Sequence, residues 1–566
     1  MASCSSVACA PGRVVTWRLD GRRSGVWDLT VSGRPVRRTS VPPVRASEAS
    51  DAGWGPPIEP RLDTVVNTLP IKEVLHRCLD ELTGGTSLVL QAPPGAGKTT
   101  TLPLAMLLST PEWLGDDGVI LVLEPRRLAA RAAANRMASI LGEPVGKTVG
   151  YKVRFDSKVS SATRIEVVTE GILTRRLQMD PGLENVKAVV FDEFHERSLD
   201  ADLCLALCTD VRVELRPDLR LVVMSATLGD VGPLTAEMLG GHRVIDGATD
   251  DESKTQSSTK MIKKPAPLVV SEGRAYPVRT EYLSAPGRGR FDLENSIVAA
   301  VKQALEEHPT DDGGDILVFL PGAREIDNCV RALRSNAGSK VKPQNILPLH
   351  GSLTKEAQQL ALSKTNDDSR RIVVSTPIAE SSLTIDGVRI VVDAGLRKTP
   401  RFDANKGMTR LQVVKISIAS ADQRRGRAGR VAPGTCYRLW SEMTHGTLQS
   451  DTPPEISNAD LAPLALNLAN WGGRDLLEDY ATNLPWLDPP PKGQMLAAVD
   501  LLEKLGAVDM ETGRVTATGV AMNQLPAHPR IARMLLWAAT RGPESARLAC
   551  QLAAVLGERD VLRGRD

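Results

Sequence analysis

One stretch of the sequence combines the residue types that hold phosphate groups. Residues 92–100 read APPGAGKTT and follow the apolar run Ser87–Leu90. In such a stretch, glycines let backbone N–H groups approach phosphate oxygens, a lysine neutralises the β- and γ-phosphates, and a hydroxyl binds Mg²⁺. The first position of the pattern is Ala92 rather than glycine, and a small residue is tolerated there. The predicted nucleotide-binding residues are Pro94, Gly95, Ala96, Gly97, Lys98, Thr99 and Thr100.

An acidic pair follows a second apolar run, Ala188–Phe191, in the string DEFH at 192–195. A carboxylate at the end of a strand that lies beside a phosphate-binding loop can hold Mg²⁺, and a second carboxylate can accept a proton from the attacking water. Alone, these four residues would suit a solvated strand end. Together with the loop, they predict that Thr99 and Asp192 hold the metal and that Glu193 is the general base.

Arginines are concentrated in QRRGRAGR at 423–430. Phosphoryl transfer spreads negative charge over the γ-phosphoryl oxygens, and a guanidinium group placed there accelerates the reaction by about 10³–10⁵. Arg427 and Arg430 are three residues apart and would share a face of a helix. They are predicted to be arginine fingers, and the alternative is a basic surface helix.

These residues need a scaffold, and short apolar runs rich in β-branched residues predict one. They form two sets, at 87–90, 119–123, 188–191 and 220–224, and at 315–320, 371–375 and 388–392. Helical patterns such as Leu128–Leu141 separate them. Continuous apolar strands that alternate with helices predict parallel sheets covered on both faces, and two sets predict two α/β domains.

The remaining segments have different characters. Residues 246–266 are polar and predict a loop or linker. After about residue 453 the strand signal fades and apolar residues follow helical spacing, which predicts a mostly helical region.

The N-terminal segment differs in composition from the rest. Residues 1–46 contain eight arginines and two aspartates, a formal charge of +6, which leaves −4 for residues 47–566 of the total of +2. The segment is rich in serine and arginine and has no apolar core of the secretory type, so it predicts an organellar transit peptide. Because no amphipathic helix pattern is sustained, a plastid is favoured over a mitochondrion, and the alternative is a disordered basic tail.

Composition excludes several classes of protein. Hydrophobic residues are 42% and charged residues 24% of the 566 residues, as in ordinary globular proteins. No stretch reaches the roughly 18 consecutive apolar residues that a membrane span needs. The eight cysteines are scattered, which argues against a disulfide scaffold, and the pair Cys204 and Cys208 is interpreted as buried in a helix.

With these motifs in order, the sequence resembles the DEAH group of superfamily 2 RNA helicases. Further stretches agree with this group: EPRRLAA at 124–130, TEGIL at 169–173, SAT at 225–227 and STPIAESSLTID at 375–386. The strings DEFHERSLDADL at 192–203 and NQLPAHPRIARMLL at 523–536 are most similar to HrpB-type helicases. The resemblance covers about residues 60–566.

The resemblance implies roles for particular residues. Gln423 would position the attacking water, and His195 and Ser225 with Thr227 would couple hydrolysis to domain movement. Arg136 and Asp386 would contribute to nucleotide binding. The implied RNA-backbone contacts are Arg126, Arg127, Thr169, Gly171 and Thr376.

Two departures from the family matter. Relatives stack the nucleotide base between an arginine, matched here by Arg136, and an aromatic residue, whose position is Leu362 here. We therefore expect one-sided stacking and broad use of nucleoside triphosphates. Family members also continue with more helical bundle and further C-terminal domains, so residues 522–566 are interpreted as the start of such a bundle.

The sequence thus predicts an ATP- and Mg²⁺-dependent RNA helicase that acts as a monomer without a membrane anchor, with any protein activator unidentified. The alternatives are a DNA or mixed-substrate translocase of the same superfamily and a non-catalytic RNA-binding scaffold. The predicted parts are a transit peptide, a linker, a first RecA-like domain, a polar loop, a second RecA-like domain, a winged-helix-like segment and a helical-bundle start. Their bounds are 1–46, 47–59, 60–245, 246–266, 267–450, 451–521 and 522–566.

Overall fold

A computed structural model gives the fold for most of the chain. It describes residues 7–8, 14–19, 27–31, 66, 69–229, 231–240, 264–272, 276–283, 290–309, 314–336, 341–363, 369–380, 385–403, 406–472, 479 and 483–557. Residues 57–516 form one compact unit, and residues 1–56 with 517–566 form another.

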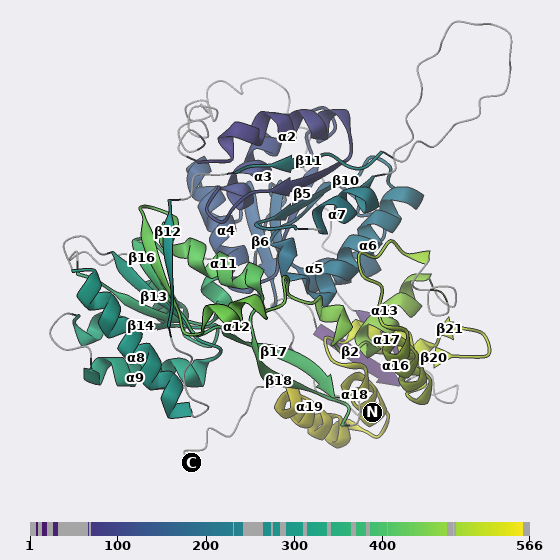
Figure 1. The fold of residues 1–566 in the computed structure, drawn as a ribbon. Coiled ribbons are helices and arrows are strands. Elements are labelled where there is room, and N and C mark those ends of the chain that lie inside the picture. The colour runs from purple at the N-terminus through teal and green to yellow at the C-terminus, as the bar shows by residue number, and fades with distance from the viewer. Residues whose placement is uncertain are drawn as a thin grey trace, which may run out of the picture. The chain divides into compact units, whose positions relative to one another are not determined.

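The first sheet has eight strands in the order β11-β4-β10-β9-β5-β8-β6-β7, and helices accompany it (Figure 1). All neighbouring strands are parallel except β6 and β7. The strands are β4 Ser87–Gln91, β5 Val119–Glu124, β6 Val149–Val153, β7 Asp156–Lys158, β8 Ile165–Thr169, β9 Val186–Phe191, β10 Arg220–Ser225 and β11 Leu268–Val270. The helices are α2 Lys72–Gly84, α3 Lys98–Leu108, α4 Arg127–Leu141, α5 Glu170–Met179, η1 Phe194–Glu196, α6 Leu199–Glu214 and α7 Val231–Leu239.

The second sheet has six parallel strands in the order β12-β19-β16-β13-β15-β14. They are β12 Val278–Tyr282, β13 Asp315–Phe319, β14 Ile346–Leu349, β15 Ile372–Ser375, β16 Val388–Asp393 and β19 Gly434–Arg438. The accompanying helices are α8 Arg290–Glu307, α9 Ala323–Asn336, η3 Pro343–Asn345, α10 Lys355–Leu362, η4 Pro377–Ala379, α11 Ile418–Gly426, η5 Arg427–Gly429 and α12 Glu442–Gly446.

The central strand β13 shows why its sequence is apolar without alternation. Ile316 and Val318 belong to one buried cluster, whereas Leu317 and Phe319 belong to another. Successive side chains of a strand point to opposite faces, so both faces of this sheet are buried. The same reasoning explains β4, in which Ser87–Leu90 are all buried.

Two smaller sheets and further helices complete the described chain. An antiparallel hairpin joins β17 Leu396–Asp403 to β18 Met408–Lys415, and β20 Val508–Asp509 pairs with β21 Arg514–Val515. The helices after the second sheet are η6 Glu455–Ser457, α13 Ala462–Gly472, α16 Lys492–Lys504, α17 Ala517–Gln524, α18 Pro529–Thr540 and α19 Pro543–Gly557.

The predicted fold class is confirmed: two parallel-sheet α/β domains precede a mostly helical region. One detail differs from the predicted bounds, because β11 lies within 267–450 but pairs with β4 of the first sheet. This strand is only three residues long, too short to be assigned to a sheet from its sequence.

Part of the predicted organisation lies outside the described residues. This holds for residues 246–263 of the polar loop and for the predicted linker at 47–59. Within the predicted transit peptide, only three antiparallel strands are described, β1 Val7–Ala8, β2 Val14–Leu19 and β3 Trp27–Val31. No helix of the described chain is long and apolar enough to cross a membrane.

Candidate nucleotide and RNA site

The predicted phosphate-binding loop connects β4 to α3, which begins at Lys98. Gly95 and Gly97 have φ angles of +86° and +91°, which side chains with a Cβ rarely adopt. A Cβ on Gly97 would lie 2.7 Å from Cδ1 of Leu69. Both glycines are therefore required by the backbone path, as a loop that wraps closely around phosphate oxygens demands.

The loop and the acid pair meet at the end of the first sheet. Lys98 Nζ donates to Glu193 Oε1 at 3.0 Å and lies 3.9 Å from Asp192 Oδ1. The Thr99 hydroxyl donates to Asp192 Oδ2. Lys98, Asp192 and Glu193 are buried, so residues about 95 positions apart form one enclosed ionic cluster.

Burial and neighbouring charges give the carboxylates of this cluster different proton affinities. Burial favours the neutral form of Glu193, but Lys98 and His195 outweigh it and lower its pKa to about 2. Burial raises the pKa of Asp192, and it raises the pKa of Glu124, at the end of β5, well above the usual range. His195 Nδ1 lies 3.5 Å from Glu193 Oε2. Lys98 and His195 thus favour the ionised form of Glu193.

Residues of the second sheet domain contact the first domain near the phosphate-binding loop. Gln423 Nε2 donates to Thr227 Oγ1 at 3.1 Å, and Ser225 Oγ donates to the Thr227 carbonyl at 2.6 Å. A Cβ on Gly95 would lie 3.8 Å from the guanidinium carbon of Arg430, so this side chain faces the loop. Burial lowers the pKa of Arg430 to about 10.

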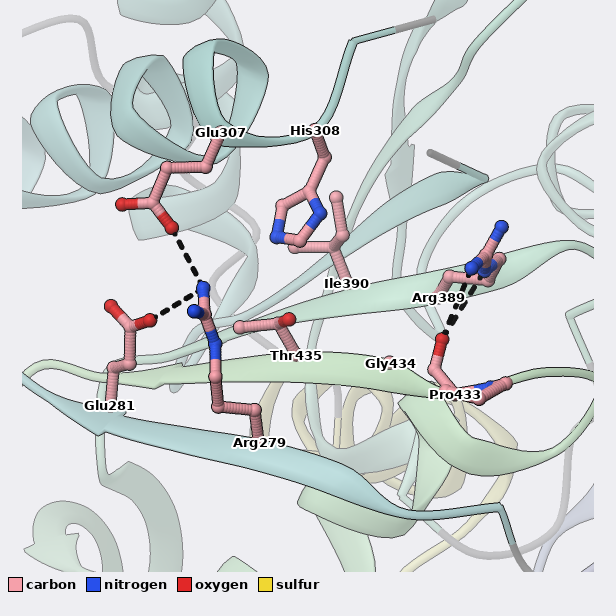
Figure 2. Close-up of a pocket in the computed structure, with 9 residues that line it drawn as sticks. All are labelled: Arg279, Glu281, Glu307, His308, Arg389, Ile390, Pro433, Gly434 and Thr435. Atoms are coloured by element: carbon pink, nitrogen blue, oxygen red, sulfur yellow. Dashed lines mark hydrogen bonds and ion pairs between the residues drawn. The ribbon is translucent and has the colours of Figure 1, made fainter. Parts of the chain in front are cut away.

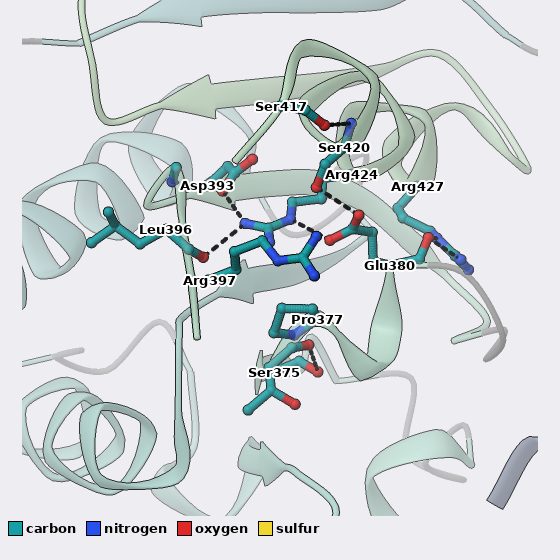
Figure 3. Close-up of polar contacts among 12 residues, drawn as sticks. Ser375, Pro377, Glu380, Asp393, Leu396, Arg397, Ser417, Ser420, Arg424 and Arg427 are labelled. Carbon is teal, nitrogen blue, oxygen red and sulfur yellow. Dashed lines mark hydrogen bonds and ion pairs between the residues drawn. The ribbon is translucent and has the colours of Figure 1, made fainter. Parts of the chain in front are cut away.

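A buried network holds the arginine-rich segment in place (Figure 3). Arg424, at the end of α11, donates to Glu380 Oε2 and to Asp393 Oδ1, each at 2.8 Å, and its side chain is fully buried. Arg427 Nε donates to the Glu380 carbonyl at 2.9 Å. No role was predicted for Arg424, Glu380 or Asp393 from the sequence.

Comparisons with known proteins now identify the domains. Residues 72–232 match the DEAD/DEAH box helicase family, and residues 297–432 match the helicase conserved C-terminal domain. The chain carries the paired domains of a DEAH-type helicase.

Relatives of this helicase core are similar in sequence and structure. It is 41% identical over 493 residues to the ATP-dependent RNA helicase HrpB of Escherichia coli, and 34% identical over 472 residues to the pre-mRNA-splicing factor ATP-dependent RNA helicase prp22 of Schizosaccharomyces pombe. These alignments cover 87% and 83% of this chain, and 55% and 37% of the relatives. The chain thus spans about half the length of HrpB and less of prp22.

Two crystal structures of the Escherichia coli protein, titled DEAH/RHA helicase HrpB and DExH-box NTPase HrpB, match the fold. Their TM-scores are 0.75 and 0.71, each at 40% identity, and each comparison covers 88% of this chain and 58% or 55% of the other. The two sheets, with the helices that accompany them, are therefore RecA-like domains of the helicase type.

The residues predicted to contact RNA lie in different surroundings within the helicase core. Arg126 Nη2 lies 3.0 Å from Glu196 Oε1, and Arg126 Nη1 donates to the Pro377 carbonyl at 3.0 Å, so this side chain links the two RecA-like domains. Thr376 directly precedes Pro377. Arg127 and Gly171 are exposed, and Thr169 and Thr376 are half-buried.

The residues predicted to contact the nucleotide lie on different elements, and no direct contact joins Arg136 to Leu362 among the described contacts. Arg136 is exposed on α4, and Asp386 is exposed before β16. Leu362 is half-buried and packs against the second-domain core rather than presenting an open side chain. One-sided base stacking therefore stays a prediction.

Cys204 and Cys208 are fully buried in α6, as expected. Among the described residues, no group of three His, Cys, Asp or Glu side chains could hold a metal ion by itself.

A cavity of about 610 Å³ lies over β12, β16 and β19, where Arg279 is paired with Glu281 and Glu307 (Figure 2). None of the predicted site residues lines it.

Proposed function

We propose that the chain is an RNA-stimulated nucleoside triphosphatase that uses ATP to move along or remodel RNA. The observation that carries this proposal is the cluster of Lys98, Thr99, Asp192 and Glu193 at the end of the first sheet. From the second RecA-like domain, Arg430 faces Gly95 of the loop and Gln423 contacts Thr227. The similarity to proteins named ATP-dependent RNA helicase supports RNA as the nucleic acid.

The chain's own residues suggest how hydrolysis would proceed. Gly95, Gly97 and Lys98 bind the phosphates, and Glu193 accepts the proton of the attacking water while Gln423 orients it. In the structure, Lys98 donates to Glu193. When phosphate oxygens give Lys98 another anionic partner, its hold on Glu193 weakens, and Glu193 becomes a better proton acceptor. Arg427 and Arg430 stabilise the charge on the transferred group.

The residues present fit a Mg²⁺ ion. The Thr99 hydroxyl and the Asp192 carboxylate are already in contact, and both are hard oxygen donors at the mouth of the loop. Mg²⁺ prefers one or two carboxylates together with substrate phosphates and water. When bound, the ion would neutralise phosphate charge. Thr99 and Asp192 would hold it.

Phosphate release tests the proposal. The full chain is incubated with ATP and Mg²⁺, alone or with single-stranded RNA or DNA of the same sequence, and Lys98→Ala serves as the inactive control. We expect turnover that RNA increases more than DNA. No turnover would contradict the enzyme proposal and favour a scaffold, and equal stimulation by DNA would favour a mixed-substrate translocase.

We also propose, from the composition of residues 1–46, that the protein is directed to plastids. The basic, serine-rich segment supports this proposal, and a mitochondrion is the alternative. The protein is proposed to act as a monomer.

A further inference from the structure

The segment directly after the acid pair has an unusual backbone. Glu193 and Arg197 bracket the 3₁₀ turn η1, with φ angles of +51° and +47°. Neither is a glycine, and residues with a Cβ persist in this backbone conformation only where the surrounding structure holds them in it. The contacts that fix Arg197 therefore also bear on Glu193, four residues away.

The Arg197 side chain is tied to two carboxylates and a ring. Its Nε and Nη2 donate to the two oxygens of Asp202 at 3.0 and 3.1 Å, and Nη2 also donates to Asp488 Oδ2 at 2.6 Å. The guanidinium carbon lies 5.7 Å from the centre of the Phe194 ring. The side chain is 7% exposed. Arg197 thus joins the turn beside Glu193 to a residue that follows the second RecA-like domain.

The backbone makes the same connection. The Glu455 N–H donates to the Arg197 carbonyl at 3.0 Å, and the Leu199 N–H donates to Glu455 Oε2 at 3.1 Å. Glu455 precedes α13 in the sequence, and Asp488 follows it. A shift of Glu455 and Asp488 relative to the first domain must therefore break these contacts or move Arg197.

We propose that Arg197, Asp488 and Glu455 form a positioning unit through which the region after the second RecA-like domain sets the placement of Glu193. The inference rests on the proposed triphosphatase function. Phe194 transmits the position, since its buried ring lies against Arg197 and its backbone continues directly from Glu193. RNA bound against the region after the second domain would then be sensed at the general base. Arg197 does not touch the reacting atoms and acts through the turn.

Asp488→Asn in the full chain tests this unit, because it removes the charge and keeps the shape. Asp500→Asn is the matched control, because Asp500 is similarly exposed, at 57% against 49%, and forms an ion pair with Lys504 of its own helix α16 at 2.7 Å. Two quantities are measured, backbone hydrogen exchange of residues 193–202 without ligands and the ratio of ATP turnover with single-stranded RNA to turnover without it. The ratio is informative because loss of folded protein lowers both rates and leaves it unchanged.

We expect Asp488→Asn to speed exchange in residues 193–202 and to lower the ratio about two- to fivefold, the scale of a half-exposed ion pair. Asp488→Glu, which keeps the carboxylate, should restore much of the ratio, and Asp500→Asn should change neither quantity. Unchanged exchange or an unchanged ratio in Asp488→Asn would overturn the inference. The absence of turnover in the wild-type chain would instead contradict the proposed function, and the exchange measurement would still decide whether Asp488 holds the turn.

Discussion

Glu193 is held between a lysine and a histidine inside the ionic cluster. Lys98 and His195 keep its pKa low, so the carboxylate is ionised and able to receive a proton at neutral pH. Glu193→Gln keeps the shape of the side chain but cannot accept a proton. We expect the variant to bind ATP and to lose about 10²–10⁴ in turnover, measured by nucleotide binding and phosphate release. Lys98→Ala should weaken binding as well. Near wild-type turnover in the glutamine variant would show that Glu193 is not the base.

Gly97 can be tested by adding one methyl group. The φ angle of +91° and the 2.7 Å approach of Leu69 Cδ1 oppose a Cβ at this position. We expect Gly97→Ala to lower the free energy of unfolding by about 1–3 kcal/mol and to weaken ATP binding. Gly84→Ala is the control, because its Cβ would enter open space. If denaturant unfolding finds equal stability for the two variants, the loop does not require a glycine here.

At the scale of single elements, the sequence predicted the elements better than the contacts between them. Lys98, Asp192 and Glu193 could be placed together because each follows an apolar strand of one parallel sheet, and the carboxyl ends of parallel strands share an edge. The sequence could not predict that Arg424 is buried while its neighbour Arg425 is 42% exposed. Both are arginines, and only the orientation of helix α11 decides which side chain points into the domain.

The network around Arg424 should therefore dominate the stability of the second domain. Arg424→Met would leave Glu380 and Asp393 without their shared cation, and losing one partner of a buried pair costs about 3–5 kcal/mol. Arg425→Met is the control, because its side chain is 42% exposed and should matter by about 0.5 kcal/mol or less. Thermal and denaturant unfolding of both variants provide the measurement. Similar stabilities would contradict the importance of the network.

Helix α5 begins with a carboxyl group whose environment opposes ionisation. Burial, followed by Asp200 and Glu196, raises the pKa of Glu170 to about 8 from 4.5. As the pH rises, Glu170 loses its proton in the unfolded chain before it does so in the folded protein. The free energy of unfolding therefore decreases as the pH rises from about 4.5 to 8.

Glu170→Gln cannot titrate, so its stability relative to wild type should increase between pH 5 and pH 8 and then level off. Denaturant unfolding at several pH values measures this difference. The exposed Glu112→Gln should show no such trend. A difference that is independent of pH would show that Glu170 is ionised in the native protein.

At the scale of the whole molecule, the order of motifs along the chain anticipated which distant segments meet. Residues 92–100 and 423–430 are more than 300 positions apart, yet Arg430 faces Gly95. Gln423 contacts Thr227, which lies 196 positions away. Residues 455–488 could not be connected to Arg197 in the same way, because an ion pair between an arginine and an exposed aspartate leaves no periodic signal in a sequence.

The subcellular localisation of the protein can be tested separately from its catalytic activity. A fusion of residues 1–60 to a fluorescent reporter carries all eight arginines of the first 46 residues. Because the segment is basic, rich in serine and without a secretory apolar core, we expect the reporter to enter plastids of plant cells and to be cleaved near Ala46. Microscopy gives the compartment, and the size of the imported reporter gives the cleavage position.

A matched fusion in which Arg13, Arg18, Arg22 and Arg23 are replaced by glutamine should import less, because it lacks half of the arginines in this segment. Exclusively mitochondrial fluorescence would correct the compartment and keep the transit-peptide interpretation. Diffuse cytosolic fluorescence from the unaltered fusion would contradict that interpretation and leave residues 1–46 as a basic tail. In that case, the eight arginines would have to be explained by a local role, such as electrostatic attraction to RNA phosphates, and RNA affinity of the full chain should then fall more steeply with salt than that of a chain lacking these residues.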